Sequence, residues 1–68
     1  MRLISIIIPC FNEEKFIKKL LNKIQIVKKR RKLKLEIIVV DDGSTDNSKN
    51  IIKKFKNVKL ICQKNSGK

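Results

Sequence analysis

Two adjacent aspartates are the strongest candidates for chemistry in this sequence. Asp41 and Asp42 directly follow a short apolar run, residues 36–40, and Gly43 follows them. The apolar run suits a buried strand, and the polar residues 44–46 can each cap the start of a helix. A carboxylate at such a corner can accept hydrogen bonds from a nucleoside, bind Mg²⁺, or bond to the turn itself. The residues alone leave these three roles open.

A second polar loop, residues 9–13, follows another apolar run, residues 2–8. Ligands bind at the carboxyl ends of the strands in parallel α/β sheets, and neighbouring strands would bring this loop beside the two aspartates. Phe11 and Pro9 offer a surface on which a flat ring can rest, and Glu13 adds a third carboxylate. We therefore expect a pocket at this edge of the sheet.

The side chains at the end of the second apolar run should point in two directions. Successive residues of a strand face opposite sides of a sheet. Val40 and Asp42 then face one side, and Asp41 faces the other. We expect the two aspartates to have different roles.

Hydrophobic periodicity predicts the elements that hold these loops. They alternate as strand, helix, strand, helix and strand, which is half of a doubly wound α/β fold. We expect Asn12 to cap the first helix and Pro9 to end the first strand. The predicted elements are strands at residues 2–8, 35–40 and 58–62, and helices at about residues 13–29 and 45–56.

The predicted sheet is parallel, Rossmann-like and ordered 3-2-1. Right-handed crossovers then place both helices on one face. The other face would expose alternate residues of three apolar strands, and such a bare patch marks an interface. We therefore expect residues 1–68 to be the amino-terminal, truncated part of a larger domain. Either the remainder of that domain or a partner would cover the open face.

The composition favours contact with phosphate-rich partners. The formal net charge is +12, and residues 28–34 form the basic run KKRRKLK. A solvated lysine-rich surface and a small basic nucleic-acid-binding protein both remain open from these residues. Aromatic residues, which stack on bases, make up only 4% of the chain, so nucleic acid is the less favoured partner.

The two cysteines, Cys10 and Cys62, lack the spacing of a metal or redox motif. We expect both to be buried free thiols in a reducing compartment. No apolar run approaches the roughly 20 residues that span a bilayer. These features predict a cytoplasmic protein that can touch a membrane surface. The phosphate-binding motif G-x-G-x-x-G and the P-loop are both absent from the sequence.

Three segments together resemble a known enzyme family. They are residues 5–14 (SIIIPCFNEE), residues 36–46 (EIIVVDDGSTD) and residues 65–68 (NSGK). They look like the start of the family 2 nucleotide-diphospho-sugar glycosyltransferases, which have a GT-A fold with one Rossmann-like sheet. The resemblance covers nearly the whole chain in the right order. The Asn-Glu-Glu variant and the N-x-G-K end are similar to enzymes that transfer sugars to polyprenyl phosphates.

The resemblance implies roles for particular residues. Those that would bind the donor nucleotide are Pro9, Phe11, Glu13, Val40 and Asp42. Asp42 would hold the base or the ribose, and Phe11 stands where the family often has Tyr. Lys68 would approach the phosphates.

The resemblance also implies a reaction. An inverting transferase moves a sugar from a nucleotide diphosphate to an acceptor hydroxyl or a polyprenyl phosphate, and Mg²⁺ or Mn²⁺ neutralises the departing diphosphate. The family's metal-binding Asp-x-Asp and its catalytic base would lie beyond residue 68, so we expect no catalytic or metal-binding residue in this chain and no turnover by it alone. An inactive truncated remnant stays open as an alternative, beside the nucleic-acid-binding protein.

Overall fold

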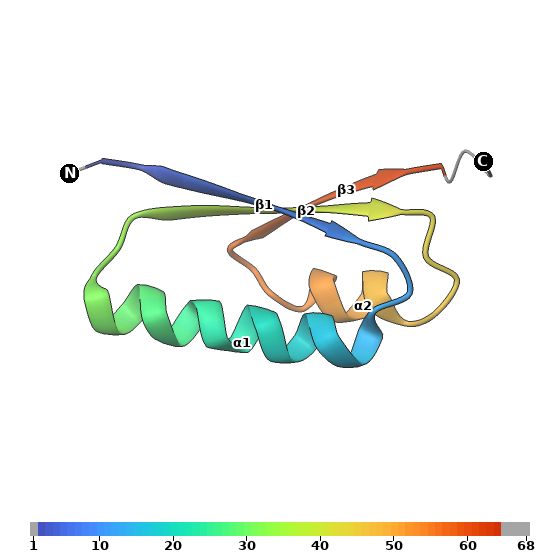
Figure 1. The fold of residues 1–68 in the computed structure, drawn as a ribbon, viewed down its shortest axis with the longest axis horizontal. Helices are drawn as coiled ribbons and strands as arrows, with labels where there is room; N and C mark the ends of the chain where they lie inside the picture. Colours follow the sequence, from blue (N-terminus) through green and yellow to red (C-terminus); the bar gives the residue numbers. More distant parts are fainter. Residues whose placement is uncertain (1, 65–68) are drawn as a thin grey trace.

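A computed structural model describes residues 2–64 of the chain (Figure 1). Helices and strands alternate in the predicted order. They are β1 (Ile4–Cys10), α1 (Glu14–Arg31), β2 (Leu35–Asp42), α2 (Ser48–Lys53) and β3 (Val58–Gln63). The molecule measures 40 × 21 × 17 Å, and α1 runs along its longest axis.

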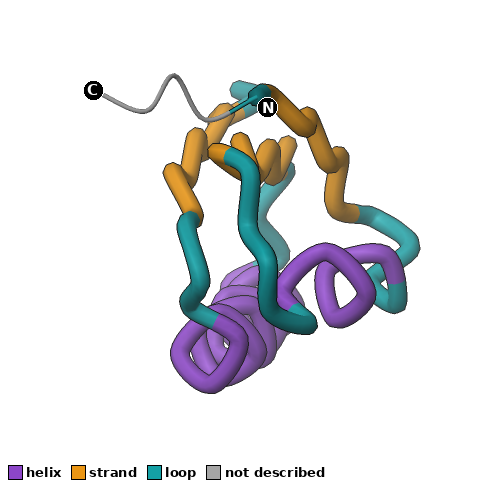
Figure 2. The backbone as a smooth tube through the Cα atoms, turned by 90° about the vertical axis from the view of Figure 1, so that its right-hand side faces the viewer, coloured by secondary structure: helices purple, strands orange, loops and turns teal. Residues whose placement is uncertain are grey.

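The three strands form one parallel sheet in the order β1-β2-β3, which confirms the predicted order. The register places Ile7 of β1 opposite Ile38 of β2, and Ile38 opposite Lys59 of β3. Both helices lie on the same side of the sheet (Figure 2), as right-handed crossovers require. The prediction of one covered face and one bare face is therefore confirmed for the described residues.

The core lies between the central strand β2 and the two helices. Ile37 and Val39 of β2 are at most 1% exposed. Ile17 and Leu21 of α1 and Ile52 of α2 are equally buried and belong to the same apolar cluster. Since full burial of one such side chain contributes about 1.5–3 kcal/mol, this cluster is the main source of stability for the fold.

The other face of the sheet is apolar and bare. Ile7 is 66% exposed and Ile61 is 42% exposed, while Ile38 and Val40 between them are half-buried. None of the described residues covers this surface, so it has the character of an interface rather than of an ordinary protein surface.

Several element boundaries differ from the prediction, including the end of β2, which continues beyond Val40 to Asp42. β1 continues through Pro9 to Cys10, because β1 is an edge strand, where a missing N–H on the open side removes no ladder bond. α2 is short, from Ser48 to Lys53. The polar residues before it belong to a loop that bonds to the start of α1, so they do not extend the helix.

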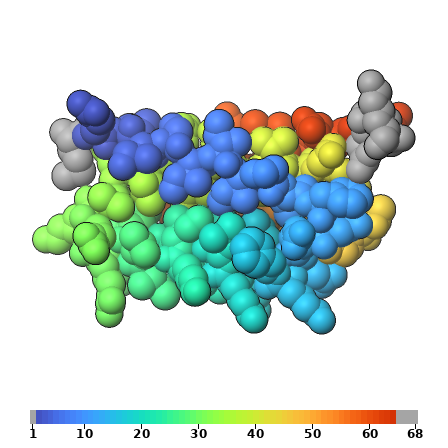
Figure 3. All heavy atoms as spheres, viewed as in Figure 1, coloured from blue at the N-terminus to red at the C-terminus, as the bar shows by residue number. Residues whose placement is uncertain are grey.

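α1 ends at a residue with a left-handed backbone. Lys32 has φ 52° and ψ 42°. The N–H of Leu33 donates to the carbonyl of Lys28 at 3.0 Å, and the N–H of Lys32 donates to that of Lys29 at 3.4 Å. This is the Schellman pattern, in which glycine is the usual left-handed residue. Figure 3 shows long side chains of α1 projecting away from the sheet along the edge of the molecule.

Candidate functional site

Asp41 closes the turn at the carboxyl end of β2. Its side chain is fully buried, and its oxygens accept hydrogen bonds from the backbone N–H of Ser44 at 3.0 Å and from the Ser44 hydroxyl at 2.6 Å. Gly43 lies between them with φ 74°, a left-handed value that glycine adopts without steric cost. Of the three roles that the sequence left open, Asp41 therefore has the one within the turn.

Asn12 joins the two loops. Its side-chain oxygen accepts hydrogen bonds from the backbone N–H of Thr45 at 2.7 Å and of Asp46 at 3.2 Å. Its own N–H donates to the Ser44 hydroxyl at 2.9 Å. Asn12 has φ 49°, a value that asparagine tolerates better than most residues. The prediction that Asn12 caps α1 is wrong, because its side chain bonds to the neighbouring loop instead.

The second loop supplies the cap of α1. The N–H of Glu13 donates to the Ser48 hydroxyl at 3.1 Å, and the N–H of Glu14 donates to the Asp46 carboxylate at 3.2 Å. The Ser48 hydroxyl and N–H both donate to the other oxygen of Asp46. Desolvation raises the pKa of Asp46, but hydrogen bonds from Ser48 and Glu14 outweigh it and hold that pKa below its usual value. The two loops thus form one hydrogen-bonded unit.

The two cysteines differ in exposure. Cys10 is 3% exposed. Burial raises the pKa of its thiol, a hydrogen bond with Ser48 offsets part of this, and the carboxylate of its register partner Asp41 raises the pKa further. Cys62 is exposed, so the expectation of two buried thiols is wrong for Cys62. It lies near the end of β3, which is the other edge strand.

Three of the residues predicted to bind a nucleotide lie on the bare side of the sheet. Pro9 pairs in register with Val40. Asp42, the last residue of β2, is half-buried and accepts a hydrogen bond from the Gln63 side chain at 3.3 Å. Asp41 is buried on the helix side, so the predicted alternation of the two aspartates is confirmed.

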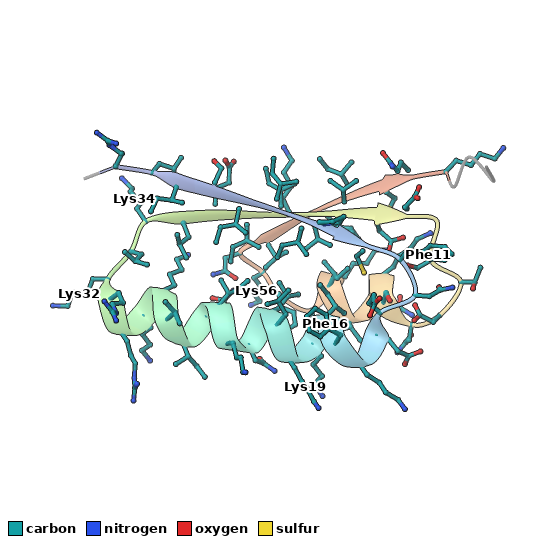
Figure 4. All side chains as sticks on the ribbon, viewed as in Figure 1. Phe11, Phe16, Lys19, Lys32, Lys34 and Lys56 are labelled. Atoms are coloured by element: carbon teal, nitrogen blue, oxygen red, sulfur yellow. The ribbon has the colours of Figure 1, made fainter. Side chains whose placement is uncertain are left out.

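The other two predicted residues lie in the first loop. Phe11 is 46% exposed and lies at the end of the molecule opposite Lys32 (Figure 4). Glu13 is exposed and lines a cavity of about 340 Å³ between β1 and α1 together with Pro9. Neither Phe11 nor Asp42 lines this cavity. The structure therefore places the predicted residues at one edge of the sheet but does not gather them around this cavity.

The sequence model of glycosyl transferase family 2 matches residues 5–68, a range that includes both loops. The chain belongs to glycosyl transferase family 2. The resemblance that the sequence motifs carry is therefore confirmed. The three-stranded parallel sheet agrees with a partial Rossmann-like domain of this family 2 chain.

Several transferases are similar to this family 2 chain. It is 40% identical over 52 residues to undecaprenyl-phosphate 4-deoxy-4-formamido-L-arabinose transferase of Pseudomonas fluorescens, which covers 76% of this chain and 15% of that protein. It is 44% identical over 54 residues to UDP-N-acetylglucosamine–dolichyl-phosphate N-acetylglucosaminyltransferase of Methanococcus voltae, and the match covers 79% of this chain and 20% of that protein. It is 38% identical over 69 residues to glycosyltransferase GlyG of Streptococcus pneumoniae, and the match covers 96% of this chain and 22% of that protein. The chain thus spans a small part of each relative. No solved structure matches it.

Three further findings concern the predicted phosphate contact, metal binding and membrane spans. Lys68, the predicted phosphate contact, lies outside the described residues. Within residues 2–64, no group of three or more Cys, His, Asp or Glu side chains is arranged to hold a metal ion. No helix in the described part of the chain combines the length and the apolar character needed to cross a membrane.

The sequence did not predict that Ser48 and Asn12 hold the two loops together. Ser48 is fully buried, and its hydroxyl links Glu13 to Asp46. The residue type of Asn12 was compatible with its left-handed backbone, since asparagine is enriched at positive φ. Its partners could not be read from local sequence, because Thr45 lies 33 residues further along the chain.

Proposed function

We propose that this chain is the donor-binding segment of an inverting glycosyltransferase that uses a nucleotide-diphospho-sugar. The observation that carries the proposal is the joining of two loops, at the carboxyl ends of the adjacent strands β1 and β2, through Asn12. That edge is where ligands bind in open parallel sheets. Membership of family 2 supports transferase chemistry for the complete domain.

Asp42 is the residue to which we assign the main nucleotide contact. Asp41 is buried and bonded to Ser44, whereas Asp42 is half-buried on the bare side of the sheet. Its carboxylate accepts a hydrogen bond from the Gln63 side chain at 3.3 Å. Since a carboxylate accepts about four hydrogen bonds, ribose hydroxyls or a base N–H can bond to it as well.

We assign supporting roles to the other predicted residues. The exposed ring of Phe11 offers a stacking surface for the base. Pro9 and Val40, which are register partners, provide an apolar floor beside Asp42. Glu13 lies at the start of α1, and Lys68 would approach the phosphates.

The acceptor that we propose is a hydroxyl or a polyprenyl phosphate. Two similar proteins are named for undecaprenyl phosphate and dolichyl phosphate. In the complete domain a divalent cation, Mg²⁺ or Mn²⁺, would neutralise the charge of the diphosphate. We place the metal ligands and the catalytic base outside residues 1–68, so this chain alone should not turn over substrate. The remainder of the domain would also cover the bare face of the sheet.

A chimera tests the proposed contact. In it, this chain replaces the matched segment of the Methanococcus voltae transferase, and UDP and GDP are titrated in turn by calorimetry with Mg²⁺. We expect Asp42→Asn to weaken binding of the preferred nucleotide by about 10- to 100-fold, the usual range for loss of a hydrogen bond to a charged group. Glu36→Gln is the matched control, because Glu36 lies on the same strand and bonds to Ser5 at 2.8 Å. Equal affinities for the chimera and its Asp42→Asn variant would refute the assignment.

A further inference from the structure

The charges of this chain are separated along its length. Five of its six acidic residues belong to the two joined loops and the end of β2: Glu13, Glu14, Asp41, Asp42 and Asp46. The opposite end holds a group that we call the basic end: Lys28, Lys29, Arg30, Arg31, Lys32 and Lys34. Figure 4 shows Lys32 and Lys34 at the end of the long axis away from Phe11.

Stabilisation of the carboxyl end of α1 does not by itself explain why so many cations gather at the basic end. Cations in the last turn of a helix interact favourably with its dipole, and each contributes a little. The basic end instead places six cations within seven residues, where pairs such as Lys28 and Arg31, three residues apart on α1, repel one another. Five of the six side chains are exposed and Lys28 is half-buried. Such a cluster favours an anionic surface that neutralises it.

Exposed apolar side chains stand beside the basic end. Ile26 and Val27 precede it in α1 and are 56% and 48% exposed. Ile4, at the start of β1, is 46% exposed, and its N–H donates to the carbonyl of Lys34 at 2.9 Å. Ile4 and Val27 line one apolar groove of about 330 Å³ between β1 and α1. Cationic and apolar side chains therefore share this end of the molecule.

We propose that the basic end is a contact surface for a lipid bilayer that contains anionic phospholipids. The cations attract the headgroups, and Ile26 and Val27 enter the boundary between headgroups and acyl chains. This contact does not depend on nucleotide binding, because the acidic loops lie at the other end of a 40 Å axis.

Nucleic acid fits the basic end less well. The three aromatic residues of the chain are Phe11, Phe16 and Phe55, and none belongs to the basic end. Proteins that bind single strands stack bases on such rings. The exposed apolar side chains beside the basic end would gain nothing from a phosphate backbone, whereas a bilayer removes them from water.

Co-flotation of the full 68-residue chain with vesicles tests the contact. Vesicles of phosphatidylcholine alone are compared with an equal mixture of phosphatidylcholine and phosphatidylglycerol at physiological salt. We expect binding to the mixed vesicles and none to the neutral ones. The variant Lys29→Gln/Arg30→Gln/Arg31→Gln should bind about 100-fold more weakly, since each cation near the surface contributes about fivefold.

A matched triple variant controls for net charge. Lys15→Gln/Lys18→Gln/Lys19→Gln removes the same charge from the other end of α1, where Figure 4 shows Lys19 pointing away from the sheet. It should lose less than about fivefold in vesicle affinity. Equal losses in the two triple variants would overturn the proposal, because binding would then follow net charge rather than the basic end.

A second pair of variants separates a bilayer from nucleic acid. Ile26→Ser should weaken vesicle binding by about tenfold, because a buried apolar side chain is lost from the contact. Phe16→Ser is the control, since Phe16 is 58% exposed on the same helix but lies outside the basic end. An unchanged affinity in Ile26→Ser, or tighter binding to a short DNA duplex than to the mixed vesicles, would each overturn the proposal.

Discussion

The side-chain oxygen of Asn12 lies 2.7 Å from the backbone nitrogen of Thr45, and this hydrogen bond joins two loops that are 33 residues apart in the sequence. The loops follow β1 and β2, which are neighbours in the sheet. A second bond links the N–H of Asn12 to Ser44, whose hydroxyl bonds to Asp41. The edge proposed to bind the nucleotide is therefore held in shape by hydrogen bonds between polar groups of the two loops.

Replacing Asn12 should destabilise the fold. Asn12→Ala removes two hydrogen bonds accepted from backbone N–H groups and a longer one accepted from the Thr45 hydroxyl, and it leaves a non-glycine residue at φ 49°. We therefore expect a loss of about 2–3 kcal/mol in the free energy of unfolding. Asn12→Gly places a residue that adopts positive φ without steric cost at this position, so it should lose less stability than Asn12→Ala. Urea unfolding of the 68-residue chain measures both. Asn22→Ala, an exposed site on α1, serves as control, and a change below about 0.5 kcal/mol in Asn12→Ala, as at ordinary surface sites, would contradict this role.

The pH dependence of stability should depend on Asp46. Its pKa in the folded chain lies below its usual value, so the folded state binds fewer protons there than the unfolded state does. The stabilisation is present above the ordinary aspartate pKa of about 3.9 and is lost as the pH falls through the lower folded value. The Asp46→Asn variant should therefore be less stable than the unmodified chain at neutral pH. It should also lose less stability as the pH falls.

Thermal unfolding at a series of pH values from neutral downward measures this effect. Asn47→Ala changes the same loop without removing a carboxylate, so it should keep the acid-dependent loss of stability. The role assigned to Asp46 is wrong if Asp46→Asn and the unmodified chain lose stability in parallel between about pH 4 and pH 2.

A glycine at the end of α1 should stabilise the protein. Lys32 has φ 52°, and a side chain at a left-handed position costs about 1 kcal/mol relative to glycine. Lys32→Gly should therefore raise the free energy of unfolding by about that amount. Lys29→Gly removes the same charge inside the helix, where glycine should lower stability by about 1 kcal/mol. Chemical denaturation distinguishes the two, and a loss of stability in Lys32→Gly would contradict the assignment.

The two thiols should react at different rates. Cys62 is exposed, whereas Cys10 is buried and its pKa is raised, so the thiolate fraction of Cys10 at mildly alkaline pH is reduced. We expect Cys62 to react with iodoacetamide at least about tenfold faster than Cys10 in the folded chain. In urea the two rates should converge. Mass spectrometry of peptides reports each site, and similar rates in the folded chain would show that Cys10 is accessible.

The arrangement of the sheet could be predicted because it follows from patterns within each segment. Apolar runs separated by helical periodicity indicate parallel strands, and the handedness of crossovers then gives the bare face that Ile7 and Ile61 show. The opposite directions of Asp41 and Asp42 follow from the alternation of side chains along a strand.

The errors come from partners that are distant in the sequence. Asn12 has the local signature of a helix cap, but its side chain bonds to Thr45 and Asp46. Pro9 reads as a strand end, although it is tolerated because β1 is an edge strand. Cys62 belongs to an apolar run, yet the edge position of β3 leaves it exposed. In each case tertiary placement, which local patterns do not contain, decides the outcome.

Amide-resolved NMR of the chimera during titration with its preferred nucleotide tests the central claim most directly. If the joined loops bind the donor, amide signals from residues 10–13 and 40–43 will shift together with one saturation curve, while those of residues 28–34 stay in place. Shifts confined to residues 28–34, or no shifts at saturating nucleotide, would contradict the proposed donor site.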